Sequence, residues 1–124
     1  MSRPRILIVD DEQHIVSLVS MTLRRFGYEV LTADNGPRAL ELAAAFKIDM
    51  MVVDHSMPGM TGDELAQRVN GQMPVLMVTA KPELTSDSFP QISAVIHKPF
   101  SPTELAGKVQ EIVGPGRPPK EQTA

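Results

Sequence analysis

The chain has 124 residues, of which 42% are hydrophobic and 22% charged, and its formal net charge is −3. This length and balance are typical of one globular domain with its own core, rather than of a disordered chain. The absence of cysteine excludes disulfides and thiolate chemistry. The scattered lysines and arginines argue against direct nucleic-acid binding, and no apolar stretch is long enough for a membrane span or a signal peptide. We therefore expect a cytoplasmic domain that contacts neither nucleic acid nor membrane.

Short apolar runs alternate with helical patterns along the chain. Strands are predicted over residues 6–9, 28–33, 49–54, 75–79 and 95–96, and helices over residues 12–26, 37–46, 61–70 and 102–113. Residues 80–94 hold two prolines and several hydroxyl side chains, which favour only a short or frayed helix. Strands that alternate with helices in this way predict a parallel sheet with helices on both faces.

Local signals mark the ends and faces of the helices. Thr61 with Glu64 and Ser101 with Glu104 have the spacing of capping boxes, and Asp11 is predicted to cap the first helix. The predicted buried stripe of that first helix consists of Ile15, Leu18, Val19, Thr22, Leu23 and Phe26.

Polar side chains stand where the predicted strands end. Asp10 and Asp11 follow the first strand, and Asp54 closes the third. Thr79 closes the fourth strand, and Lys98 follows the fifth. Because the carboxyl ends of parallel strands lie at one edge of a sheet, we expect these side chains to converge there.

Three carboxylates at one place repel one another unless a cation shares the site. Magnesium prefers oxygen ligands and commonly takes one or two carboxylates, so Mg²⁺ is the expected cofactor. Asp11 and Asp54 are the predicted direct ligands, and Asp10 is predicted to act directly or through water. A backbone carbonyl near Ser56 is a further candidate ligand.

A neutralised aspartate can accept a phosphoryl group and become an acyl phosphate. In-line phosphoryl transfer depends mainly on positioning and on charge neutralisation. Lys98 suits pairing with one phosphoryl oxygen, and the hydroxyl of Thr79 can donate to another. The predicted reactive residues are therefore Asp54, Thr79 and Lys98.

Several short motifs lie at the predicted strand ends and the loops after them: Val9-Asp10-Asp11, Asp54, Met57-Pro58-Gly59-Met60-Thr61-Gly62, Val78-Thr79-Ala80 and Lys98-Pro99-Phe100. In their order and spacing within residues 4–113, these motifs together resemble the receiver domain of two-component response regulators. The resemblance implies a flavodoxin-like α/β fold, with a doubly wound five-stranded parallel sheet of order 2-1-3-4-5 and five helices. The fourth of these helices is the one expected to be short or frayed. The resemblance also implies a cis peptide bond between Lys98 and Pro99.

The resemblance implies a phosphoacceptor switch of a two-component system. Asp54 would accept a phosphoryl group from the phosphohistidine of a histidine kinase or histidine phosphotransfer protein, in a reaction that requires Mg²⁺. The domain would then change conformation to control an unknown downstream protein, or pass its phosphate on in a relay. We expect no enzymatic activity beyond self-phosphorylation from a donor and slow autodephosphorylation. We also expect a receiver domain over residues 1–114, a flexible tail over 115–124, and a monomer or weak dimer.

This sequence departs from the family pattern in three places. Val95 stands where an aromatic residue usually sits, so coupling of the site to a partner surface needs another route. Residues 80–94 are shorter and more broken than the family norm, and Thr61 replaces a common aspartate. Two alternatives remain open at this point: a receiver-like binding module that is never phosphorylated, and a Mg²⁺-dependent phosphohydrolase with Asp54 as its nucleophile.

Overall fold

The computed structural model describes residues 3–89 and 91–116 and shows one five-stranded parallel sheet in the order β2-β1-β3-β4-β5. The strands are β1 (Arg5–Val9), β2 (Glu29–Ala33), β3 (Met50–Asp54), β4 (Val75–Thr79) and β5 (Ala94–His97). The helices are α1 (Gln13–Arg25), α2 (Gly36–Ala45), α3 (Gly62–Arg68) and α4 (Pro102–Val113), with a 3-10 helix η1 (Ser86–Ser88). The predicted sheet type and strand order are confirmed.

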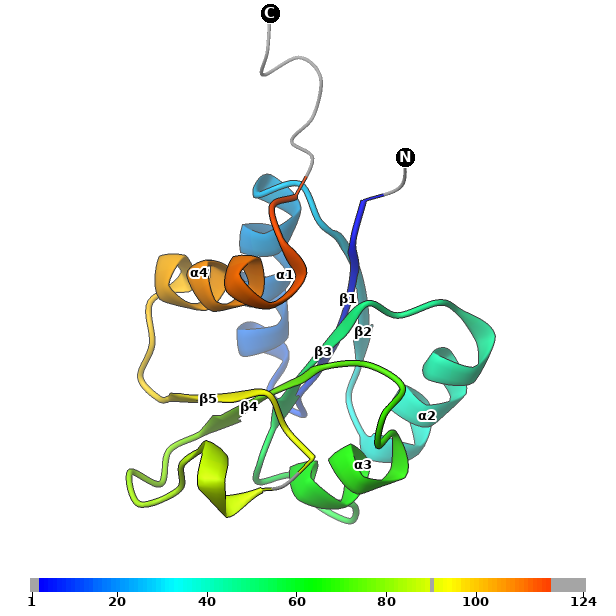
Figure 1. Ribbon diagram of the computed structural model, residues 1–124, viewed down its shortest axis with the longest axis vertical. Helices are drawn as coiled ribbons and strands as arrows, with labels where there is room; N and C mark the ends of the chain where they lie inside the picture. The colour runs from blue at the N-terminus through cyan, green and yellow to red at the C-terminus, as the bar shows by residue number, and fades with distance from the viewer. Residues whose placement is uncertain (1–2, 90, 117–124) are drawn as a thin grey trace, which may run out of the picture.

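Helices cover both faces of the sheet, with α1 and α4 on one face and α2 and α3 on the other (Figure 1). Every residue of β3 is buried, and its side chains alternate between the two faces. Met50 and Val52 pack against Leu23 and Leu105 on the α1 and α4 face. On the other face the partners of β3 come from α2 and α3. A strand buried on both sides carries a continuous apolar run, which is the pattern that the sequence shows here.

The first helix is rotated relative to its predicted stripe. Its buried residues are Val16, Val19, Ser20 and Leu23. Leu18 and Phe26, predicted to be buried, are 39% and 43% exposed. Helical spacing locates the buried side of a helix only to within about one residue. The contacts of α1 with β2 and α4 determine which of its apolar residues face the core.

Two of the three predicted helix N-caps are confirmed and one is wrong. Both capping boxes form: Thr61 accepts from the Glu64 amide, and Ser101 accepts from the Glu104 amide. The predicted cap of α1 by Asp11 is wrong, because the N-cap residue is Glu12 and its side chain makes no capping bond.

In its described residues, 80–89 and 91–93, the segment between β4 and β5 contains only η1, which confirms the expectation of a short or frayed fourth helix. Phe89, directly after η1, is 8% exposed and belongs to the core on the α2 and α3 face. Leu84 and Ile92 pack beside the same core. One buried aromatic ring thus anchors a segment that has little regular structure.

Two predictions concern the limits of the domain. Gly114, with a φ of 86°, follows α4 and ends it. Of the predicted tail over residues 115–124, residues 117–124 lie outside the described part of the chain. Within the described part, each helix is too short or too polar to cross a membrane.

Truncation of a core side chain tests the packing of α4. Leu105 is fully buried, so Leu105→Ala should lower the free energy of unfolding by about 2–5 kcal/mol through lost apolar burial and a cavity. The same substitution at the exposed Leu18 is the matched control and should cost less than about 1 kcal/mol. Urea denaturation of both variants measures the difference, and equal losses would contradict the assigned packing of α1 and α4.

Candidate functional site

The parallel register aligns the ends of four neighbouring strands. Val9 of β1 lies opposite Val53 of β3, so Asp10 and Asp54 follow at the same level. Asp54 is opposite Val78, which places the end of β3 beside the end of β4. The polar residues that close these strands therefore share one edge of the sheet.

Asp10, Asp11 and Asp54 lie together at this edge. Each offers a carboxylate oxygen, and these oxygens are all within 4.8 Å of one another. Asp10 and Asp54 are buried, with exposures of 4% and 5%, whereas Asp11 is exposed. The carboxylates thus form a negatively charged cluster that solvent reaches from one side.

Lys98 faces this cluster from the loop after β5. Its Nζ lies 3.0 Å from Oδ1 of Asp54 and 3.4 Å from Oε1 of Glu12. The peptide bond between Lys98 and Pro99 is cis, as the family resemblance implies. Glu12 is a site residue that the sequence reasoning missed. Its position directly after Asp11 was a signal, but only the fold brings Lys98 to it.

Burial raises the pKa of Asp10 from 3.8 to about 6. The backbone N–H of Glu12 donates to Oδ1 of Asp10 at 2.9 Å and opposes this rise, while the nearby charge of Asp54 adds to it. Burial also raises the pKa of Asp54, although Lys98 opposes the rise through a hydrogen bond and its charge. Burial lowers the pKa of Lys98, but the contact with Asp54 outweighs this effect and the net pKa is raised. A single cationic side chain therefore stands among four carboxylates, counting Glu12, which leaves the pocket attractive to a cation.

Thr79 ends β4 and Ser56 lies in the loop after β3, so both stand near Asp54. Thr79 is buried, and its Oγ1 accepts a hydrogen bond from the Lys81 amide at 3.0 Å. Ser56 is exposed and its hydroxyl lies 3.5 Å from Nδ1 of His55. All predicted site residues therefore lie on or next to the same edge, but only Lys98 contacts Asp54 through its side chain.

Gly62 lets α3 approach the end of β3 closely. A Cβ atom at this position would lie 2.6 Å from the carbonyl oxygen of Asp54 and 2.9 Å from the Cα of His55. The Gly62 amide donates to the carbonyl of His55 at 3.0 Å. This packing holds the backbone of Asp54 and His55 rigidly against the helix.

A response regulator receiver domain model matches residues 6–110, most of the chain. This chain belongs to the response regulator receiver family. The match covers β1 from Ile6, the other four strands and the acidic edge described above. The receiver identity explains why the chemistry-bearing side chains gather at the carboxyl ends of the strands, where doubly wound sheets place their ligand sites.

Curated relatives of this receiver include transcriptional regulators. The alkaline phosphatase synthesis transcriptional regulatory protein PhoP of Bacillus subtilis is 37% identical, over 88% of this chain and 48% of its own. The phosphate regulon transcriptional regulatory protein PhoB of Pseudomonas aeruginosa is also 37% identical, over 90% of this chain and 53% of its own. The chain therefore spans about half the length of these relatives.

Two solved structures are similar to this receiver in both fold and amino-acid sequence. The chemotaxis response regulator CheY4 of Vibrio cholerae has a TM-score of 0.81 and 32% identity, covering 90% of this chain and 99% of its own. The response regulator TrrA of Thermotoga maritima, solved in complex with Mg²⁺ and BeF, has a TM-score of 0.81 and 34% identity, covering 88% and 98%. The carboxylate oxygens gathered here are the donor type that Mg²⁺ prefers, so the residues of this receiver fit such an ion.

The raised pKa of Asp10 predicts that the contribution of this carboxyl to the free energy of unfolding, measured with a chelator present to remove metal ions, falls as the pH rises. A group whose pKa is higher in the folded state favours folding while protonated, so its contribution is complete below about pH 4 and is lost as pH rises through about 6. Asp10→Asn removes this loss and should be more stable than the wild type by about 3 kcal/mol above pH 7. The advantage should shrink toward zero at about pH 4.

Chemical denaturation at a series of pH values measures this difference. Asp87→Asn is the matched control at an exposed aspartate in η1, and it should not reproduce this gain in stability. A variant Asp10→Asn that is less stable than the wild type at every pH would contradict the assigned burial of this carboxyl.

Proposed function

We propose that this receiver is a phosphoacceptor switch in which Asp54 accepts a phosphoryl group from a phosphohistidine. The donor would be a histidine kinase or a histidine phosphotransfer protein. The observation that carries the proposal is the 3.0 Å contact between Lys98 and Asp54 within a cluster of carboxylates. A cation held beside one carboxylate, among others that can bind a metal, suits transfer of an anionic phosphoryl group.

The transfer step is an in-line displacement at phosphorus. A carboxylate oxygen of Asp54 forms the new P–O bond while the P–N bond to the donor imidazole breaks. The bonding pair of the P–N bond stays with the imidazole. The ring leaves as neutral imidazole when its other nitrogen carries a proton, and otherwise it takes up a proton from water. Asp54 is anchored for this step because β3 is buried and the Gly62 amide fixes the adjacent backbone.

Asp11 and Asp54 would hold a Mg²⁺ ion directly, with Asp10 acting directly or through water. The carbonyl of Ser56 would supply a further oxygen. When bound, the ion neutralises the charge that builds up on the phosphoryl oxygens. Proximity of the three carboxylates, within 4.8 Å, supports this assignment.

Lys98 and Thr79 would stabilise the acyl phosphate once it forms. The ammonium of Lys98 already lies at Asp54 and can pair with a phosphoryl oxygen. The hydroxyl of Thr79 accepts from the Lys81 amide in the unphosphorylated chain, and rotating it toward the phosphoryl group would give up that bond. The loop after β4 is therefore the first segment expected to respond.

The response of this loop would control a downstream protein or license transfer of the phosphate in a relay. Two relatives are named as transcriptional regulatory proteins, and this chain covers about half the length of each. Their names support a role in signal transduction. We expect the protein to act in the cytoplasm. The only catalysis that we assign to it is self-phosphorylation from a donor and slow hydrolysis of its own acyl phosphate.

Intact mass after incubation with Mg²⁺ and acetyl phosphate tests the chemistry. The wild type should gain one phosphoryl group, and Asp54→Asn should gain none because its amide is not a nucleophile toward phosphorus. Lys98→Ala should gain less, because the phosphoryl oxygens lose their ammonium partner. Asp49→Asn is the matched control at an aspartate outside the cluster and should be phosphorylated like the wild type.

The same experiment separates the alternatives. A labile adduct that disappears with chelator supports the switch. An unmodified wild type, also after incubation with purified histidine kinases, would overturn it in favour of a binding module that is never phosphorylated. Repeated hydrolysis of an external ester such as p-nitrophenyl phosphate, dependent on Asp54, would instead identify a phosphohydrolase.

Addition of Mg²⁺ tests the metal assignment without requiring phosphorylation. An ion that binds only the folded chain raises its stability, by about 2.7 kcal/mol at a concentration one hundred times Kd. The melting temperature of the wild type should therefore rise with Mg²⁺ at neutral pH. Asp11→Asn should lose most of this rise, and Asp87→Asn, at an exposed aspartate in η1, should keep it. An equal rise in all three proteins would contradict the assigned ligands.

A further inference from the structure

The segment between β4 and β5 is tied to the rest of the domain by a few side-chain contacts. At its start, the Lys81 amide donates to Oγ1 of Thr79 at 3.0 Å. In its middle, Nε2 of His97 lies 2.7 Å from the carbonyl oxygen of Leu84. Because residues 81–89 contain only η1, these contacts rather than a helical ladder determine the position of the segment.

An aromatic contact ties the end of the segment to the loop that follows β3. The rings of His55 and Phe89 have centroids 5.4 Å apart and an interplanar angle of 49°. Such a tilted pair lies within the range in which aromatic rings attract one another. Phe89 is buried, so its ring cannot move without disturbing the core around it.

His55 is fixed at its backbone and directly follows Asp54. Its amide donates to the carbonyl of Val78 at 2.8 Å, and its carbonyl accepts from the Gly62 amide at 3.0 Å. Its ring also lies 3.7 Å from Oδ1 of Asp63. A change at the end of β3 therefore reaches the ring of His55 through a short and constrained path.

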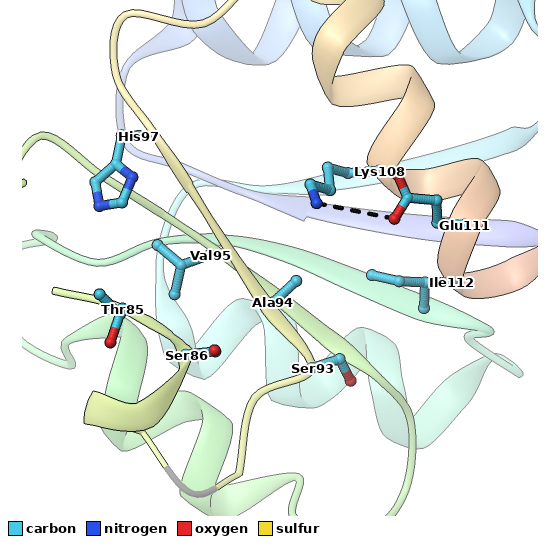
Figure 2. Close-up of a pocket in the computed structure, with 9 residues that line it drawn as sticks. All are labelled: Thr85, Ser86, Ser93, Ala94, Val95, His97, Lys108, Glu111 and Ile112. Atoms are coloured by element: carbon cyan, nitrogen blue, oxygen red, sulfur yellow. Dashed lines mark ion pairs between the residues drawn. The ribbon is translucent and has the colours of Figure 1, made fainter.

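Val95, at the position of the usual aromatic residue, packs beside the apolar core to which Phe89 belongs but has no ring to place against His55. It lines a groove of about 500 Å³ along β5, with Thr85 and Ser86 on one side (Figure 2). On the other side of the groove lies α4, where Lys108 and Glu111 form an ion pair at 3.8 Å. Val95 is half-buried, and its side chain lies between this groove and the core rather than at the acidic edge.

We propose that His55 is the positioning residue that couples the state of Asp54 to residues 81–89 through its contact with Phe89. This inference rests on the proposed phosphorylation of Asp54 and specifies how that event is transmitted. A phosphoryl group adds volume and negative charge beside His55. Both ends of the segment then respond together, one through Thr79 and the other through the ring of Phe89.

Hydrogen exchange of the full chain tests this coupling. Exchange in peptides covering residues 81–89 is measured with Mg²⁺, before and after addition of beryllium fluoride, which mimics the phosphoryl group. The wild type should show a clear change on activation. The quantity compared is the ratio between the exchange rates before and after activation. His55→Ala should reduce this ratio by about fivefold or more, a loss typical of a broken coupling. Acetyl phosphate should still add one phosphoryl group to this variant.

Conservative and control variants separate coupling from a structural role. His55→Phe keeps an aromatic ring against Phe89 and should restore the response. Val95→Ala should leave the response as in the wild type. A residue with only a structural role would change exchange equally before and after activation, so the ratio between the two states identifies coupling.

The outcomes keep this inference distinct from the proposed function. Failure of the wild type to take up a phosphoryl group overturns the phosphoacceptor function itself. Normal phosphorylation combined with an unchanged exchange ratio in His55→Ala overturns the coupling alone. Normal phosphorylation with no response in the wild-type segment overturns the coupling together with the response assigned to the loop after β4. If His55→Ala fails to fold, Phe89→Leu removes the same contact from the opposite side, and an unchanged response in that variant also overturns the inference.

Discussion

The parallel pairing of β1 with β3 is the constraint on which the site depends. It places Asp10 and Asp54 at the same level of the sheet, although they are distant in the chain. Burial at this edge makes ionisation costly, which the raised pKa of Asp10 reflects. Lys98 compensates for only part of the negative charge, since it contacts Asp54 and Glu12 alone among the acids of the cluster. A divalent cation would complete the balance.

The packing that makes the core also gives the site its rigidity. All residues of β3 are buried, so Asp54 stands at the end of a strand that side chains hold on both faces. Gly62 brings α3 against the carbonyl of Asp54, where a side chain would collide with the backbone. The proposed phosphoryl transfer would gain from such pre-organised positioning, because little reorganisation would be needed when a donor arrives.

The segment after β4 contrasts with this rigid edge. The regular structure of its described residues is limited to η1, and its buried anchor Phe89 packs both on the core and on His55. With few backbone hydrogen bonds of its own, such a segment opens at lower cost than a strand or a long helix. A firmly held Asp54 next to a weakly held segment is an arrangement that can convert a local charge change into a conformational one.

The sequence by itself determined the features that depend on local interactions. Apolar runs predicted the strands, Thr61 with Glu64 predicted a helix start, and the broken segment predicted a short helix, because caps, turns and strand patterns involve residues a few positions apart. The acids at the strand ends could also be placed at one edge, since parallel strands share a direction.

Only the tertiary structure decided the features that join distant parts of the chain. The rotation of α1, which exposes Leu18, follows from its packing against other elements. The contact of Glu12 with Lys98 and that of His55 with Phe89 join residues far apart in sequence, and no local pattern encodes them. The raised pKa of Asp10 likewise needs the surrounding structure, because burial is a property of everything packed around a group rather than of its neighbours in the chain.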